Sequence, residues 1–241
     1  MEKLCIIALF FIIRGQYKIF SQVPPVTIPN LFNITMMDSF FGGKNSFVDT
    51  VIILETEYTT DQEFNCAKAL FAELGYIFIK INPIGLTGAF IGVVTYNETT
   101  HLQMPLRKAT TYQELILGGL PSYTLSASQT NTKVDGSLAL ANAMLNKAGR
   151  SGALKKVWLF LSNTSSTNPL PIAQAMKNNK TEIYVFAVYD NVDPVKLNGI
   201  ASSGNVMWFS KYCVLPQKYI FDSYATTTTS LSPTSTPVPP G

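Results

Sequence analysis

The fold is decided by residues 49–59, which read Asp49-Thr-Val-Ile-Ile-Leu-Glu-Thr-Glu-Tyr-Thr59. Val48 and Val51–Leu54 form a nearly continuous apolar run of strand length, as expected of a strand that is covered on both faces of a sheet. Three polar side chains follow at alternate positions: Glu55, Glu57 and Thr59. We therefore expect a central strand over this run, with a polar set directly behind it.

Behind this strand the sequence predicts a long helix from about Asp61 to Ile81. Its apolar residues are spaced alternately by three and four positions, which places them on one helical face. They are Phe64, Ala67, Phe71, Leu74, Phe78 and Ile81. The β-branched and aromatic residues of 76–81 would also suit a strand, but the unbroken apolar stripe favours the helix.

The rest of the chain alternates apolar runs with helical patterns, which indicates a mainly parallel sheet. Ala89–Thr95 and His101–Leu106 are expected as an antiparallel hairpin pair, with Pro105 at an edge and His101 in a structural role. Further strands are expected over 157–161, 182–188 and 205–209, and helices from Thr111, over 134–148, over 168–177 and from Asp193 to about 202.

The two ends of the chain differ from the middle in composition. Residues 1–21 have a charged start and the apolar run Leu4–Ile13, which is typical of a secretory signal peptide. A membrane anchor, the alternative, needs about 20 apolar residues, and Arg14 ends this run early. Residues 22–46 are interpreted as a linker and 47–224 as one domain with a C-terminal extension. Residues 225–241 hold nine Ser or Thr and four Pro, which predicts a mucin-like stalk; a disordered tail without glycans is the alternative.

The cysteines and the N-glycosylation sequons are those expected of a secreted protein. Removal of a signal peptide takes Cys5 away and leaves Cys66 and Cys213, which could pair in an oxidising compartment. The N-glycosylation pattern occurs at Asn33, Asn97, Asn163 and Asn179. We therefore expect a secreted, extracellular glycoprotein without a membrane span once the signal peptide is cleaved.

The charge balance excludes one class of partner. The net charge of +3 is spread thinly, and no Lys/Arg run is longer than the pair Lys155-Lys156. This pattern does not indicate a nucleic-acid-binding surface.

Several phrases, in order along the chain, resemble a von Willebrand factor A-type domain. Residues 49–59 resemble the opening strand with its DxSxS motif, 91–96 the hairpin, 130–132 the TNT segment, 157–163 the strand that ends in a metal-binding Asp, and 183–190 with 197–202 the closing strand and helix. The resemblance covers about Phe47 to Ser210. It implies a doubly wound, mainly parallel six-stranded α/β sheet with one antiparallel edge strand and helices on both faces.

The same resemblance implies one site at the carboxyl ends of the strands, where such sheets bind ligands. The positions that hold a metal ion in the family are here Glu55, Glu57, Thr59, Thr130 and Asn163. Thr130 matches and Thr59 replaces a serine hydroxyl, but the two glutamates and the neutral asparagine depart from the pattern. Magnesium demands near-octahedral oxygens at about 2.0–2.1 Å. We therefore predict a degenerate site without a bound ion; magnesium, or calcium with its looser geometry, is the alternative.

Further expectations follow from the family. Its topology places Cys66 and Cys213 near one another, which implies a bridge between them. The predicted function is a secreted module that binds an extracellular protein or matrix ligand without the usual metal bridge, similar to the modular secreted proteins of invertebrates. A structural glycoprotein without a specific ligand is one alternative. A hydrolase using Glu55 and Glu57 is the other, although no catalytic motif supports an enzyme.

Overall fold

A computed structural model describes residues 46–122, 124–125, 132–162, 167–188 and 192–209. The predicted signal peptide, almost all of the linker, the stalk, Thr130, Asn163, Asn33 and Cys213 lie outside these residues. Within them, no helix is long and apolar enough to cross a membrane.

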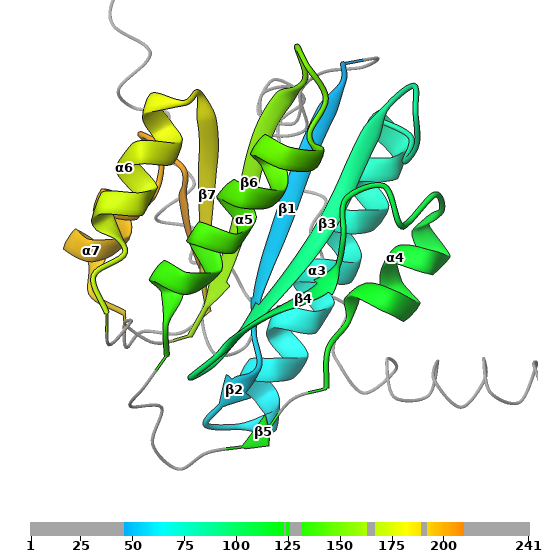
Figure 1. Ribbon diagram of the computed structural model, residues 1–241. Coiled ribbons are helices and arrows are strands. Elements are labelled where there is room, and N and C mark those ends of the chain that lie inside the picture. The colour runs from blue at the N-terminus through cyan, green and yellow to red at the C-terminus, as the bar shows by residue number, and fades with distance from the viewer. Residues whose placement is uncertain (1–45, 123, 126–131, 163–166, 189–191, 210–241) are drawn as a thin grey trace, which may run out of the picture.

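The centre of the fold is a six-stranded sheet with the order β4-β3-β1-β6-β7-β8 (Figure 1). Its strands are β1 (Val48–Glu55), β3 (Ala89–Tyr96), β4 (Thr100–Met104), β6 (Leu154–Leu161), β7 (Thr181–Val188) and β8 (Val206–Phe209). All neighbours pair in parallel except β3 and β4, which are antiparallel and place β4 at the edge. The predicted doubly wound sheet with one antiparallel edge strand is confirmed.

Helices cover both faces of this sheet. The helices α3 (Asp61–Ile81) and α4 (Tyr112–Gly119) contribute Phe71, Phe78 and Leu115 to the core on one face. The helices α5 (Val134–Ala148), α6 (Leu170–Asn178) and α7 (Pro194–Ile200) contribute Leu138, Ala173 and Leu197 to the core on the other. The side chains of β7 alternate between the two cores as a strand buried on both faces requires.

Several predicted elements differ from the observed ones. The strand β6 begins at Leu154, three residues earlier than expected, and β4 ends at Met104, before Pro105. The helix α6 begins at Leu170, two residues later than expected, because Pro169 is its N-cap, and α7 ends at Ile200. A second sheet, formed by the two-residue strands β2 (Glu57–Tyr58) and β5 (Thr124–Leu125), had no sequence signal. The alternative of a strand over 76–81 is wrong, because α3 continues through it.

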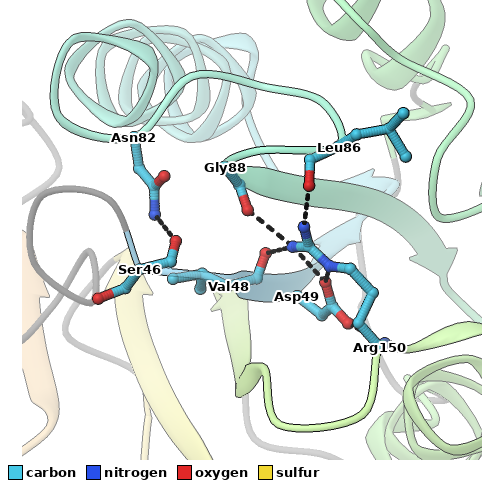
Figure 2. A network of polar contacts seen from close by, with 7 residues as sticks. All are labelled: Ser46, Val48, Asp49, Asn82, Leu86, Gly88 and Arg150. Carbon is cyan, nitrogen blue, oxygen red and sulfur yellow. Dashed lines mark hydrogen bonds and ion pairs between the residues drawn. The ribbon is translucent and has the colours of Figure 1, made fainter.

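An ion pair joins the start of β1 to two loops at the amino end of the sheet (Figure 2). The guanidinium of Arg150 contacts the carboxylate of Asp49 at 2.7 Å, and Asp49 is fully buried. The same guanidinium donates to the carbonyls of Val48, Leu86 and Gly88 at 2.9, 3.1 and 2.7 Å. Arg150 therefore connects the starts of β1 and β3 with the loop that follows α5.

Candidate functional site

Glu55, the last residue of β1, is buried at the carboxyl end of the sheet, with 1% of its surface exposed. Its Oε2 accepts hydrogen bonds from the backbone N and the hydroxyl of Ser162, at 2.7 and 2.8 Å. Ser162 directly follows β6. Glu55 therefore joins the ends of two neighbouring central strands, a role that the sequence analysis did not anticipate.

Burial raises the pKa of the Glu55 carboxyl to about 8, because desolvation outweighs the two hydrogen bonds from Ser162 and the nearby Glu63 and Glu57 add to the rise. Tyr58 and Tyr96 lie in the same environment, and the pKa of each phenol is raised by burial and then by Glu55. The Tyr96 hydroxyl donates to the carbonyl of Phe160 at 3.1 Å. At neutral pH the Glu55 carboxyl therefore keeps its proton, buried beside Tyr58 and Tyr96.

The third predicted position, Thr59, is held by a side chain that the family pattern does not include. The backbone N and the hydroxyl of Thr59 both donate to the carboxylate of Glu63 at 2.7 Å. Glu63 is 2% exposed and also accepts from the backbone N of Thr60, whose hydroxyl accepts from the N of Glu63. This reciprocal pair is a capping box at the start of α3. The spacing Thr60-x-x-Glu63 is a capping-box signal that could have found it, but the sequence-based prediction did not use it.

Glu57 is half-buried on β2, which pairs in parallel with β5. The strand β5 directly precedes residues 126–131, which carry Thr130. On the other side, the hydroxyl of Thr167 donates to Asp135 at 2.6 Å, joining the segment after Asn163 to the first turn of α5. The described flanks of all five positions therefore converge at one end of the sheet, although Thr130 and Asn163 themselves lie outside the described residues.

The described side chains do not match the oxygen set that the family uses for a metal ion. The Oε2 of Glu55 is engaged by the backbone N and the hydroxyl of Ser162. The hydroxyl of Thr59 donates its hydrogen bond to the carboxylate of Glu63. The Oε1 of Glu55 is buried and has no hydrogen-bond partner among the described residues. Among the same residues, no group of three or more His, Cys, Asp or Glu side chains is placed to hold a metal.

Fold and site together define a class: a doubly wound α/β domain with its polar set at the carboxyl ends of the central strands, where such folds bind ligands. The family of the von Willebrand factor type A domain matches residues 55–217, which is more than half of the chain. The chain therefore belongs to this family, whose domains generally serve as protein-interaction or adhesion modules. A search of the curated proteins finds no match to this sequence.

Several solved structures have the same fold. Proximal thread matrix protein 1 from the mussel byssus, with a zinc-occupied MIDAS motif, is similar at a TM-score of 0.61 and 16% identity, over 70% of this chain and 45% of that one. A von Willebrand factor type A structure from Catenulispora acidiphila has a TM-score of 0.54 at 17% identity, over 74% and 42%. The manganese-loaded TRAP protein of Plasmodium vivax has a TM-score of 0.52 at 13% identity, over 70% of each chain. This chain thus spans less than half the length of the first two.

The remaining predicted residues are distributed over the domain. Cys66 is buried in α3 and is disulfide-bonded; Cys213 lies outside the described residues, so the pairing of the two stays a prediction. Asn97 lies in the β3–β4 hairpin at the carboxyl end, where its Oδ1 accepts from the hydroxyl of Thr99 at 3.1 Å. Asn179 is the exposed C-cap of α6 at the amino end. Glycosylation of these residues stays a prediction.

Proposed function

We propose that this chain is a secreted extracellular module that binds a protein or matrix ligand at the carboxyl end of its sheet, without a metal ion between the two partners. Two protein-only networks support this proposal: Ser162 on Glu55, and Thr59 and Thr60 on Glu63. In the usual mode the metal takes its last ligand from the partner. Here Glu55 joins the ends of β1 and β6 through Ser162, and Glu63 fixes Thr59 and Thr60 at the start of α3.

The burial of Glu55 also argues against the hydrolase alternative. A catalytic carboxylate must come within hydrogen-bond reach of its substrate, but Glu55 is 1% exposed and its Oε2 is taken by Ser162. Glu57 lies on the separate strand β2. We therefore propose a binding role and no catalytic one.

Solid-phase binding of the secreted chain to a panel of purified extracellular matrix proteins tests the proposal. Gln62→Arg adds a bulky cation at the second residue of α3, at the carboxyl end, and should weaken binding at least tenfold. Gln113→Arg makes the same change at the second residue of α4, away from that end, and is the matched control; both glutamines are exposed. Binding should be the same in a chelator and in magnesium, calcium or manganese.

Two results would contradict this function. Binding that disappears in the chelator would restore the metal-bridged mode. Absence of saturable binding to any member of the panel, with and without divalent cations, would favour a structural glycoprotein without a specific ligand.

A further inference from the structure

The N-glycosylation sequon at Asn97 lies in the turn between β3 and β4, at the carboxyl end of the sheet, where β2 and β5 also lie (Figure 1). Asn97 is half-buried, whereas Glu98 and Thr99 are exposed. The other sequon among the described residues begins at Asn179, the exposed C-cap of α6 at the amino end. The two sequons therefore lie at opposite ends of the sheet.

Hydrogen bonds within this turn engage the oxygen of the Asn97 amide and leave its nitrogen available. The Oδ1 accepts from the backbone N of Thr99 at 2.9 Å and from the hydroxyl of Thr99 at 3.1 Å. The Thr99 hydroxyl also contacts the Nε2 of His101 at 2.7 Å. The Nδ2 of Asn97, the atom to which an N-linked glycan is attached, donates to no acceptor among the described residues. A glycan on this nitrogen therefore disrupts none of these contacts.

Backbone contacts fix the turn against the segments that hold the candidate site. The carbonyl of Asn97 accepts from the backbone N of Lys133, the residue before α5, at 3.0 Å. The carbonyl that precedes Asn97 accepts from the backbone N of Thr56, between β1 and β2, at 2.9 Å. Gly136 in the first turn of α5 approaches the hairpin so closely that a Cβ there would come within 2.8 Å of the Thr100 hydroxyl. A glycan on Asn97 is thus attached at a fixed place beside the starts of β2 and α5.

The start of α5 connects this turn with the other side of the candidate site. Asp135 in its first turn accepts from the hydroxyl of Thr167 at 2.6 Å, in the segment that leads to α6. The side chain of Lys133 is exposed, and its backbone is hydrogen-bonded to Asn97. Because an N-linked glycan is bulky and lies on the surface, a glycan on Asn97 covers the solvent side of Lys133 and of the neighbouring part of the candidate site.

We infer that Asn97 carries an N-linked glycan that shields the β3–β4 side of the carboxyl end from large molecules and leaves it open to small ones. In the attachment reaction the Nδ2 forms a bond to C1 of an oligosaccharide carried on a lipid diphosphate. The bond between C1 and the diphosphate oxygen breaks, and the Nδ2 gives up one proton. The shielding does not depend on a ligand. Its consequence rests on the function proposed above: a ligand of the carboxyl end must approach from the side away from β4.

Acylation of lysine side chains by a small and a large reagent tests this inference on the full chain secreted from cultured animal cells. The small reagent is an active ester of acetate, and the large one is the same ester on a polyethylene glycol chain. Peptide mass spectrometry gives the glycan occupancy of Asn97 and the acylation rates of the exposed side chains of Lys133 and Lys180; Lys180 directly follows Asn179. The ratio of the large-reagent rate to the small-reagent rate at one lysine cancels its amine reactivity and reports steric access.

Two matched variants remove one sequon each. Asn97→Asp keeps an Oδ1 acceptor for Thr99, so the turn is preserved without the glycan. It should raise the ratio at Lys133 about threefold, because blocked approach directions slow the encounter with a large molecule, and should leave the ratio at Lys180 unchanged. Asn179→Asp is the control at the amino end and should leave the ratio at Lys133 unchanged. Equal melting temperatures establish that both variants fold.

Several results would overturn the inference. These are the absence of a glycan on Asn97 in the secreted chain, an unchanged ratio at Lys133 in Asn97→Asp, or an equal rise of that ratio in Asn179→Asp. In the matrix-protein assay Asn97→Asp should bind at least as tightly as the unaltered chain; weaker binding would show that the glycan is part of the contact rather than a shield. If no variant binds any matrix protein while the ratio at Lys133 still rises in Asn97→Asp, the proposed function fails and the shielding stands.

Discussion

Replacing Glu55 by Gln should flatten the pH dependence of the stability of this domain. Glutamine has nearly the same shape, and its amide oxygen can still accept the two hydrogen bonds from Ser162. It does not titrate. The pH-dependent part of the contribution of Glu55 is therefore removed while the packing at the end of β1 is kept.

The size of the effect follows from the pKa values. The folded carboxyl has a pKa of about 8, against an ordinary value of 4.5. Between these values the folded protein holds a proton that the unfolded chain releases, so the free energy of unfolding falls as the pH rises. The stabilisation is complete below the unfolded pKa and is lost as the pH approaches the folded one. From pH 5 to pH 7 the loss amounts to about 2.5 kcal/mol.

Urea unfolding at pH 5, 6 and 7, followed by circular dichroism, measures this quantity. The variant should gain about 2.5 kcal/mol relative to the unaltered protein between pH 5 and pH 7, because the contributions of all other groups cancel in the difference. Ser162→Ala is the control: it removes a hydrogen bond that favours the ionised carboxylate, so it should keep the pH slope. A stability difference between Glu55→Gln and the unaltered protein that does not change with pH would refute the reasoning.

Three further predictions concern the networks at the two ends of the sheet. Glu63→Ala leaves the backbone N of Thr59 and Thr60 without their acceptor, so it should lower the free energy of unfolding in urea by about 2 kcal/mol. Glu63→Gln keeps an acceptor oxygen and should lose less. Equal losses in the two variants would show that the effect comes from packing alone. Arg150→Ala leaves Asp49 buried without its partner and should lower the free energy of unfolding by about 3–5 kcal/mol. Arg150→Lys should recover only part of this stability, because an ammonium group cannot reproduce the forked contacts of the guanidinium. Full recovery of the stability would contradict this prediction. Calorimetric titration with magnesium, calcium, manganese or zinc should give no saturable heat in the micromolar range, and saturable binding would overturn the metal-free interpretation of the site.

Local patterns were sufficient to predict the strands of the central sheet and the helices that cover it. The apolar run at Val51–Leu54 and the stripe from Phe64 to Ile81 predict β1 and α3 with nearly the observed bounds, because both depend on periodicity within a single segment. The two-residue strands β2 and β5 escaped prediction, since a pairing between Glu57 and Thr124 depends on how distant loops meet.

The candidate site likewise has features that the sequence predicts and features that only the tertiary structure shows. Spacing located Glu55, Glu57 and Thr59, and the family resemblance assigned them to the carboxyl end of the sheet. The partners that decide their chemistry, Ser162 for Glu55 and Glu63 for Thr59, became clear only in three dimensions. Ser162 is 107 residues from Glu55 in the chain, so no local pattern could have connected them.

The sequence by itself determined the family, the alternation of strands and helices, and the position of the polar set, because each depends on short-range order in the chain. It also indicated a thin, even spread of charge. Only the tertiary structure decided that Glu55 is a buried carboxyl with a raised pKa, and that Arg150 pairs with the buried Asp49, 101 residues away in the chain. The physical reason is common to both: burial and electrostatic fields depend on which distant segments the sheet brings together.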